Sequence, residues 1–171
     1  MNNLDIHYEY RTGIGTDIHR LVEGRELKLG GIFVPFDKGL LAHSDGDVVL
    51  HAIIDSLIGA AGLGDIGMLF PDSDPQFKNI DSKELALKTR DYIAAKNWEI
   101  VNIDIIVTAE EPKLGPYKMQ MKRCIADLMG IDFINVNVKA KTNEGLGEIG
   151  SGLAISAMAN VLLRRRIKRS L

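Results

Sequence analysis

Residues 43–61 read HSDGDVVLHAIIDSLIGAA, and this stretch is the clearest helix signal in the sequence. Ser44 and Asp47 have the spacing of a capping box, with aspartate where glutamate is more common. The pair predicts a helix from about residue 45 to residue 61. The apolar residues around His51 and Asp55 leave little of this helix for solvent, so we expect it to be largely buried.

The segments on either side alternate between strand and helix patterns. Alternating side chains predict a strand at 9–19, followed by a hairpin centred on Gly30 and Gly31. The stretch 69–81, LFPDSDPQFKNID, has two prolines, three aspartates and no apolar period, which predicts a long, mobile loop. After it we expect, in chain order, a helix over 81–96, a buried strand at 102–109, a helix over 116–129, a strand at 134–142 and a final helix over 152–163.

This order of elements predicts an α+β fold. Helices on one side of a small mixed sheet would form a two-layer α/β sandwich, and the absence of repeats and linkers makes 1–171 a single domain. Residues 1–9 are expected to be an N-terminal extension, and 164–171 a basic, solvated C-terminal tail. One layer of helices covers only one face of a sheet, so we expect a homo-oligomer to cover the other face.

The composition is that of an ordinary globular chain. Of the 171 residues, 46% are hydrophobic and 26% are charged, which disfavours disorder, collagen and coiled coil. The net charge of -2 offers no positive field for nucleic acid, and no apolar run approaches the roughly 20 residues that span a bilayer. The N-terminus lacks a signal-peptide pattern, and the single cysteine, Cys124, cannot form an internal disulfide. We therefore expect a cytoplasmic protein with no nucleic-acid and no membrane partner.

Two short patterns contain candidate metal ligands. Asp17 and His19 are two residues apart on the predicted strand, which places both side chains on one face. Asp47, His51 and Asp55 follow one another at intervals of four along the predicted helix and form a polar stripe. A surface polar pair and a solvent-facing stripe are the alternative interpretations. If His51 joins Asp17 and His19, two imidazoles and a carboxylate leave one position open, as in catalytic zinc sites.

Residues near the ends of two predicted elements are candidates for binding phosphate or a second metal. His43 and Ser44 precede the long helix, where backbone N–H groups and the helix dipole favour anions. Thr142 and Glu144, at the end of a predicted strand, offer a hydroxyl and a hard carboxylate ligand suited to magnesium. Loop residues without a binding role are the alternative interpretation for each pair.

Gly145, Gly147 and Gly150 form a G-x-G-x-x-G pattern between a predicted strand and a predicted helix. In a dinucleotide-binding fold, another strand and an acidic residue about 20 positions later would follow this pattern. The sequence pattern predicts neither, so we expect no dinucleotide site.

Four segments together resemble the 2-C-methyl-D-erythritol 2,4-cyclodiphosphate synthases of the non-mevalonate isoprenoid pathway. They are TDIH at 16–19, LLAHSDGDVVLHAIIDSLIGAAGLGDIGMLFPDSDP at 40–75, AEEPKLGPY at 109–117 and KAKTNEGLG at 139–147. The resemblance runs from about residue 10 to residue 163, and the long second segment is highly specific. It implies an α/β sandwich that assembles as a homotrimer with sites between subunits. It also implies a lyase that converts 4-diphosphocytidyl-2-C-methyl-D-erythritol 2-phosphate into the cyclic diphosphate and CMP.

The resemblance also implies roles for individual residues. Asp17, His19 and His51 would hold zinc, with a substrate phosphate oxygen as fourth ligand, and Glu144 would hold magnesium or manganese at the substrate diphosphate. His43 and Thr142 would be catalytic, because they would stabilise charge on the phosphoryl groups. The substrate-binding residues would be Asp17, His19, Ser44, Asp65, Ile66, Gly67, Phe70, Pro71, Asp72, Ser73, Asp74, Ala109, Glu110, Glu111, Pro112, Lys113, Leu114, Gly115, Lys141 and Asn143.

These substrate-binding residues divide by the part of the substrate they would contact. Ser44 and residues 65–67 would contact the methylerythritol phosphate part, and residues 70–74 would form a mobile lid. Residues 109–115 and 141–143 would line the cytidine diphosphate site, largely through backbone groups.

The sequence also departs from the family pattern. Glu148 and Ser151 stand where many members have Phe and Arg, which are linked to phosphate binding in the central cavity of the trimer. We therefore expect isoprenoid diphosphates to bind poorly there. Lys141 stands where many members have Thr, and it adds a cation near the nucleotide phosphates.

Two functions of other classes are open alternatives. The first is a metal-stabilised binding or regulatory protein without turnover, and the intact set of candidate site residues argues against it. The second is a zinc-dependent phosphohydrolase that releases a linear product. It would need a base to activate water, and Asp55 is the one candidate that stands out. The simpler role of Asp55 is to orient a neighbouring residue.

Overall fold

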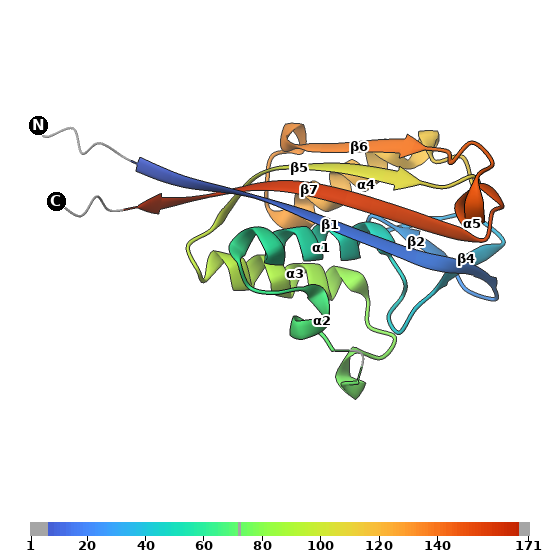
Figure 1. Ribbon diagram of the computed structural model, residues 1–171, viewed down its shortest axis with the longest axis horizontal. Coiled ribbons are helices and arrows are strands. Elements are labelled where there is room, and N and C mark those ends of the chain that lie inside the picture. The colour runs from blue at the N-terminus through green and yellow to red at the C-terminus, as the bar shows by residue number, and fades with distance from the viewer. Residues whose placement is uncertain (1–6, 72, 168–171) are drawn as a thin grey trace, which may run out of the picture.

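The computed structural model of the chain describes residues 7–71 and 73–167 (Figure 1). Within these residues, one mixed sheet has the strand order β4-β1-β7-β5-β6. Every neighbouring pair is antiparallel except β5 and β6, which are parallel. The strands of the sheet are β1 (His7–Glu23), β4 (Lys38–Leu41), β5 (Glu99–Thr108), β6 (Val136–Lys141) and β7 (Ala154–Ile167), and β2 (Leu27–Leu29) pairs with β3 (Ile32–Val34) in a separate hairpin.

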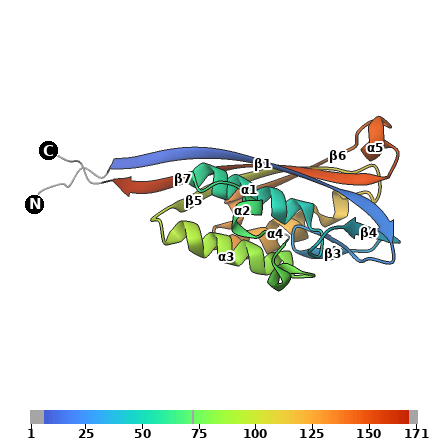
Figure 2. The ribbon, with the colours of Figure 1, turned by 60° about the horizontal axis from the view of Figure 1, so that its bottom comes forward.

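Helices cover one face of this sheet, which confirms the mixed α/β layering expected from the sequence (Figure 2). The helix α1 lies over β1 and β7, α3 packs beside α1, and α4 lies over β6. The helices are α1 (Val48–Ala61), α2 (Ile66–Leu69), α3 (Ser82–Ala94), α4 (Lys118–Met129) and α5 (Gly147–Gly150), with 3-10 turns at Pro75–Phe77, Gly115–Tyr117 and Phe133–Asn135. Among the described residues, no helix has the length and apolar character needed to cross a membrane.

Two glycines allow α1 to lie directly on β1. A β-carbon at Gly13 would be 2.1 Å from the carbonyl oxygen of Ser56, and one at Gly15 would be 2.2 Å from that of Ala52. Because these atoms belong to the helix backbone, any side chain at either position would push α1 away from the strand. The glycines thereby set the distance between α1 and the part of β1 that carries Asp17.

The start of α1 differs from the capping-box prediction. The helix begins at Val48, and its N-cap is Asp47 rather than Ser44. The Asp47 carboxylate accepts hydrogen bonds from the backbone N–H groups of Val49 and Leu50, each at 3.1 Å. It also accepts from the two glycine N–H groups in the β2–β3 turn, at 2.8 and 2.6 Å. Asp47 therefore ties the hairpin to α1, and it does not belong to a stripe that faces a binding site.

The segment 152–163 does not form a helix, so the prediction of a final helix was wrong. Most of it belongs to β7, which lies at the centre of the sheet between β1 and β5. Its side chains at 155, 157, 159, 161 and 163 are buried, and those at 158 and 160, which point to the other face, are exposed. A strand therefore does follow the G-x-G-x-x-G pattern. It is antiparallel to both neighbours, unlike the parallel strands of a dinucleotide-binding fold.

Parts of the expected extension and tail belong to the sheet. His7–Glu9 pair with Arg165–Ile167 at the far ends of β1 and β7. The ion pair between Glu9 and Arg165, at 2.7 Å, connects the two strands here. Residues 1–6 and 168–171 lie outside the described residues.

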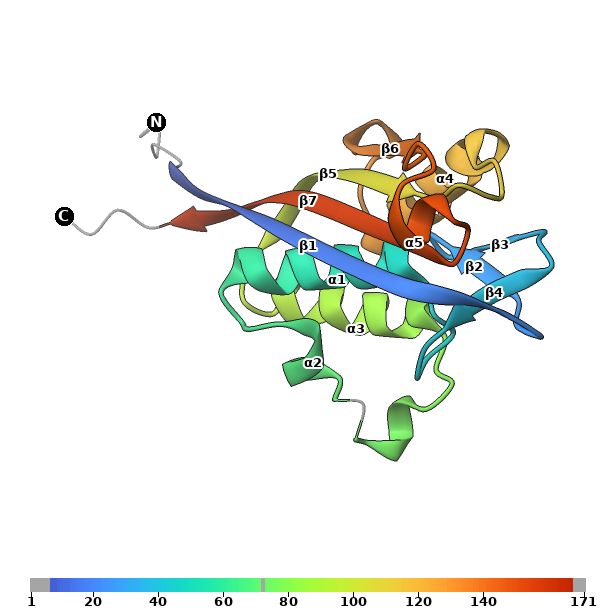
Figure 3. The same ribbon diagram turned by 45° about the vertical axis from the view of Figure 1, so that its right-hand side comes forward.

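The other expected elements are confirmed, although their ends shift by a few residues. The predicted first strand is part of β1, the hairpin is β2–β3, and Asp81 caps α3. Gly130 ends α4 in the left-handed conformation. The expected loop over 69–81 contains one 3-10 turn, and Figure 3 shows α2 and this segment projecting beyond α1 and α3 at an edge of the molecule.

The sheet face away from the helices carries exposed apolar side chains. The exposed fractions are 61% for Ile14, 56% for Ile18 and 43% for Met158. These residues alternate with the residues that face α1, because successive strand residues point to opposite faces. In a single chain, this face is therefore an apolar surface in contact with solvent.

Candidate metal and phosphate site

A cavity of about 370 Å³ lies between β1, α1, α2 and the segment that leads into α3. Most of its polar lining residues were candidates from the sequence. They are Asp17, His19, His43, Ser44 and His51, joined by Asp55. Ile66, Gly67 and Phe70, from the predicted substrate-binding set, also line the cavity. The apolar residues Phe77, Ile80 and Leu85, which the sequence analysis did not single out, complete the wall on the α3 side.

Asp17, His19 and His51 converge at this cavity, so His51 joins the pair on β1, the case that the spacing argument had left open. Asp17 Oδ2 lies 2.9 Å from His51 Nδ1 and 3.2 Å from His19 Nε2. The two imidazole nitrogens, His19 Nε2 and His51 Nδ1, are 3.2 Å apart. The β1 strand supplies the first two side chains and α1 supplies the third, so the triad depends on how closely the helix approaches the strand.

The triad perturbs its own titration. Burial alone would raise the pKa of Asp17, but the hydrogen bond to His51 and the charges of His19 and His51 outweigh it and lower the pKa below 3.8. Burial alone would lower the pKa of His51. The hydrogen bond and charge of Asp17, together with the charges of Asp47 and Asp45, outweigh burial and raise the His51 pKa above 6.5.

The donor set fits a divalent metal ion. Asp17, His19 and His51 each offer one ligand atom, and these atoms form a compact group. Ligands about 2.0 to 2.1 Å from a tetrahedral zinc ion would be roughly 3.3 Å apart, close to the observed spacings. Three protein ligands leave a fourth position, which would face the cavity. The chemistry of the donors thus suits a metal that also binds a ligand.

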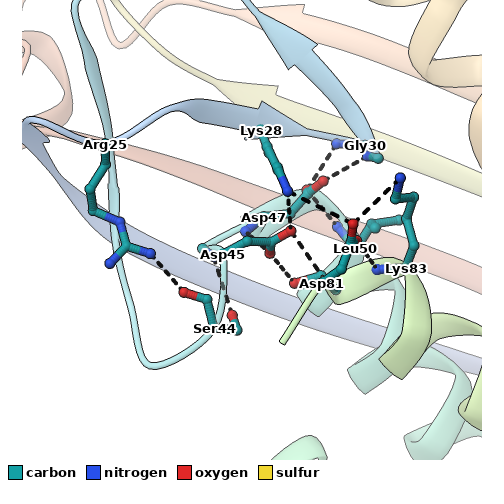
Figure 4. A network of polar contacts seen from close by, with 12 residues as sticks. Arg25, Lys28, Gly30, Ser44, Asp45, Asp47, Leu50, Asp81 and Lys83 are labelled. Atoms are coloured by element: carbon teal, nitrogen blue, oxygen red, sulfur yellow. Dashed lines mark hydrogen bonds and ion pairs between the residues drawn. The ribbon is translucent and has the colours of Figure 1, made fainter. Parts of the chain in front are cut away.

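His43 and Ser44 lie beside the triad at the start of the α1 segment. Ser44 is buried, and its hydroxyl lies 3.1 Å from Nε2 of His51. Arg25 donates to the Ser44 carbonyl oxygen at 2.7 Å and supports this turn (Figure 4). Among the described residues, Nε2 of His43 is buried without a hydrogen-bond partner. Because His43 lines the cavity, this nitrogen is available to a ligand there.

Asp55 has a supporting role that the sequence analysis only suggested. Its Oδ1 accepts a hydrogen bond from the backbone N–H of Ile66 at 3.1 Å, which fastens α2 to α1. Asp65, a predicted substrate-binding residue, instead caps α2 by accepting from the Met68 N–H at 2.8 Å. Asp55 is thus already hydrogen-bonded within the protein, as expected of a residue that orients a neighbour.

The predicted lid follows α2. Phe70 is buried against Phe77 with ring centroids 5.4 Å apart. Pro71 accepts a backbone hydrogen bond from Asp74, whose side chain caps the next 3-10 turn. Ser73 lies between them, and Asp72 lies outside the described residues. The mobility of this segment remains a prediction.

The predicted nucleotide segments meet each other elsewhere in the chain. Ala109 donates its N–H to the Lys141 carbonyl oxygen at 3.0 Å, and Asn143 donates its N–H to a Glu110 carboxylate oxygen at 3.2 Å. Thr142 donates its hydroxyl to Glu144 Oε1 at 2.5 Å. The residues brought together in this loop cluster are Ala109, Glu110, Glu111, Pro112, Lys113, Leu114, Gly115, Lys141, Thr142, Asn143 and Glu144.

Within one chain, this loop cluster and the metal triad are far apart. The strand pairing places Lys141 beside Thr108, Thr108 beside Ser156 and Ser156 beside Ile18. Three strand spacings of about 4.8 Å make this roughly 14 Å across the sheet. Ile18 points to the open face, whereas its neighbour Asp17 points to α1. None of the residues 109–115 and 141–144 lines the described cavity.

Comparison with known proteins gives matches over most of this chain. The family model described as "YgbB family" matches residues 10–164. A relative from Desulfatibacillum aliphaticivorans, named 2-C-methyl-D-erythritol 2,4-cyclodiphosphate synthase, is 55% identical over 147 residues, covering 86% of this chain and 95% of the relative.

Solved structures of proteins with the same name are also similar to this chain. A structure of 2C-methyl-D-erythritol-2,4-cyclodiphosphate synthase in a CDP-bound form has a TM-score of 0.83 and 38% identity, covering 90% of this chain and 99% of that chain. The bifunctional IspDF from Campylobacter jejuni has a TM-score of 0.89 and 43% identity over 93% of this chain, which spans 43% of that longer protein. The protein therefore belongs to the YgbB family, the family of the 2-C-methyl-D-erythritol 2,4-cyclodiphosphate synthases.

Proposed function

We propose that this protein converts 4-diphosphocytidyl-2-C-methyl-D-erythritol 2-phosphate into 2-C-methyl-D-erythritol 2,4-cyclodiphosphate and CMP. It would act as a phosphorus–oxygen lyase in isoprenoid precursor biosynthesis. The observation that carries the proposal is the Asp17, His19 and His51 triad at a cavity lined also by His43, whose buried Nε2 has no hydrogen-bond partner within the described part of the chain. Membership of the family supports the choice of substrate.

The cavity residues would bind the methylerythritol phosphate end of the substrate. Asp17, His19 and His51 would hold zinc beside the β-phosphate, and Nε2 of His43 would donate a hydrogen bond to a phosphoryl oxygen. Ser44 and the α2 segment at 65–67 would contact the methylerythritol part. The apolar walls of the cavity would exclude water from the reacting phosphates.

The cytidine diphosphate end would bind a second copy of the chain. One protomer cannot place its own loop cluster beside its own triad, because the two lie on different strands and the sheet separates them. We propose a homotrimer in which the open sheet faces pack together, so that residues 109–115 and 141–143 of one subunit approach the cavity of the next. Exposed Ile14, Ile18 and Met158 support burial of this face.

The reaction needs no nucleophile from the protein. An oxygen of the substrate's 2-phosphate would attack the β-phosphorus, a new P–O bond would form, and the P–O bond to CMP would break. When bound, zinc at the triad and magnesium or manganese at Glu144 would supply positive charge that stabilises the diphosphate and the leaving CMP oxygens. His43 and Thr142 would donate hydrogen bonds to the phosphoryl oxygens as their charge increases.

Phosphorus NMR of the purified protein with substrate, zinc and magnesium tests the proposal. We expect signals of CMP and a cyclic diphosphate, and a chelator should abolish both. A linear diphosphate would instead identify a phosphohydrolase. Unchanged substrate with zinc bound would identify a binding protein without turnover.

His51→Ala tests the metal triad directly. We expect loss of bound zinc and loss of turnover by at least about a hundredfold, because two remaining ligands hold zinc weakly. Zinc content by atomic absorption and CMP release are the measurements. His7→Ala, at the distant end of β1, is the control and should leave both unchanged. Normal zinc content and activity in His51→Ala would remove this residue from the site.

A further inference from the structure

The side chain of His51 has a second set of contacts on the ring edge away from Asp17 and His19. Its Nε2 lies 2.9 Å from the hydroxyl oxygen of Ser82, the first residue of α3. Ser82 is completely buried, although serine is usually exposed. Its hydroxyl oxygen in turn lies 2.5 Å from Oδ1 of Asp45, and its backbone N–H donates to Oδ2 of Asp45 at 3.3 Å.

The chemistry of these groups fixes the direction of the hydrogen bonds. The Asp45 carboxylate can only accept, so the Ser82 hydroxyl must use its single proton to donate to Asp45. The Ser82 oxygen then faces His51 with a lone pair and can only accept. His51 must therefore carry a proton on Nε2. Its Nδ1 lies 2.9 Å from Asp17 Oδ2 and donates to it only while the ring is charged. In the neutral ring, Nδ1 keeps its lone pair for a metal ion.

The Ser44 hydroxyl, also close to Nε2 of His51, does not change this result. It lies 3.1 Å from Nε2, and it accepts from the Gly46 N–H at 3.2 Å. A serine hydroxyl next to a histidine nitrogen can donate or accept, so Ser44 alone would allow either tautomer. Because the Ser82 proton is already donated to Asp45, the Ser82 oxygen needs a donor, and a proton on Nε2 of His51 supplies it.

The position of Asp45 is itself fixed by its neighbours. Lys28 Nζ lies 3.5 Å from Asp45 Oδ2 and 3.8 Å from Asp81 Oδ2, so it places a positive charge between the two carboxylates (Figure 4). The backbone N–H of Asp45 donates to the Ile80 carbonyl oxygen at 3.1 Å. Lys28 on β2 and Ile80, just before α3, therefore hold Asp45 in place beside Ser82.

We propose that Ser82 and Asp45 are positioning residues that select the Nε2–H tautomer of His51 and aim its Nδ1 lone pair at the metal. The inference rests on the proposed metal triad and extends it to a chain from Asp45 through Ser82 and His51 to the metal. Such outer partners of a ligating histidine fix its ring and raise its strength as a ligand.

Zinc affinity of the unmodified protein and its variants, measured by competition with a chromophoric chelator, tests this series of hydrogen bonds. Ser82→Ala and Asp45→Asn should each bind zinc about 10- to 100-fold more weakly than the unmodified protein. Ser82→Thr keeps the hydroxyl and should restore most of the affinity. Asp45→Asn is informative because an amide can donate to Ser82, which would reverse the chain and favour the wrong tautomer.

Two matched controls separate this role from general effects on folding and charge. Ser56→Ala removes an equally buried hydroxyl that donates to the Ile53 carbonyl oxygen within α1. Asp81→Asn removes the other carboxylate beside Lys28 and keeps a residue that can cap α3. Both should bind zinc as tightly as the unmodified protein. Equal affinity in all four variants would overturn the positioning role and leave the metal site intact.

The tautomer can be observed directly, without turnover. In protein labelled with ¹⁵N-histidine, long-range proton–nitrogen NMR of the zinc-loaded state should show a protonated Nε2 and a metal-bound Nδ1 for His51. In Ser82→Ala, the metal-free protein at alkaline pH should show a mixture of tautomers. In the zinc-loaded unmodified protein, a protonated Nδ1 with a metal-bound Nε2 would overturn the proposal. Failure of the unmodified protein to bind zinc would overturn the metal triad itself and the positioning role with it.

Discussion

Asp47 and His51 lie one helical turn apart, yet their side chains act in different parts of the molecule. Asp47 accepts hydrogen bonds at the start of α1 and in the β2–β3 turn, whereas His51 reaches the triad. The strand period correctly predicted that Asp17 and His19 share a face. Their meeting with His51 was implied by the family resemblance, and the sequence spacing alone left it open. The spacing could not separate a structural carboxylate from a site carboxylate on the same helix.

The sequence spacing could not predict which residues from distant segments contact the site. Ser82 is the first residue of a recognisable helix, α3, and only the packing of α3 against α1 brings its hydroxyl to His51. Asp55 was visible as a polar residue in an apolar helix, but its partner, the Ile66 N–H, depends on where α2 folds back. Such partners follow from tertiary contacts rather than from a local period.

Zinc binding should weaken with falling pH from near neutrality. Burial lowers the pKa of His51, but the hydrogen bond and charge of Asp17 outweigh burial and raise this pKa above 6.5. Below this pKa the ring gains a proton, which zinc must displace in order to bind. Each unit below that pKa should cost about tenfold in affinity. The Asp17 pKa is lowered below 3.8, so this carboxylate remains ionised throughout the window.

A chelator competition series from pH 8 to about pH 5.5 would measure this dependence. The affinity should begin to fall while the pH is still above the ordinary histidine value. A constant affinity down to pH 6 would contradict the raised pKa. Measurements of Asp81→Asn in the same series control for nonspecific effects of nearby charge.

At the scale of elements, the contact between α1 and β1 positions the metal ligands. Gly15→Ala would place a β-carbon against the helix backbone, so we expect a loss of about 1 to 3 kcal/mol in the free energy of unfolding. Zinc affinity should also fall, because the displaced α1 would move His51 away from Asp17 and His19. Urea denaturation and chelator competition are the two measurements.

Gly59→Ala is the matched control for this substitution. Gly59 is exposed on the same helix, and a β-carbon there would meet nothing within 4 Å. Alanine should stabilise α1 by up to about 1 kcal/mol and leave zinc affinity unchanged. If Gly15→Ala left stability and zinc affinity as Gly59→Ala does, the close approach of α1 to β1 would not be what positions the metal ligands.

The error over β7 has a physical cause at this same scale. Its helix-facing positions are small or branched apolar residues, but Met158 and Leu162 on the opposite face are apolar as well. The alternation of apolar and polar residues is therefore weak in this segment, and its alanines have a high helix propensity. A strand with apolar side chains on both faces gives no clear period of two. The strands with polar outward positions, such as β6, were predicted correctly.

At the scale of the whole molecule, assembly should depend on the open sheet face. Met158→Asp would place a charge among exposed apolar side chains on this face, and we expect a monomer in place of the proposed trimer. Turnover should fall by at least about a hundredfold, because the site would lose the residues of the second subunit. Zinc affinity should persist, since one chain supplies all three ligands of the triad.

Sedimentation velocity, zinc competition and CMP release measured on the same samples would test these three expectations. Ile134→Asp makes the same kind of change at a residue that is 79% exposed in a turn outside the sheet. It should alter none of the three properties. A trimeric, active Met158→Asp protein would show that this sheet face is not the assembly surface.

The pairing of His7 with Ile167 brings the outer ends of two long strands together (Figure 1). Ten residues of strand separate His7 from Asp17, which amounts to roughly 34 Å. A fluorophore, affinity handle or carrier domain attached beyond either strand end would therefore emerge at one place, remote from the metal ligands. Immobilising the protein by that end would leave the cavity open to small molecules arriving from solution, which makes it suitable for surface-based measurements of ligand binding.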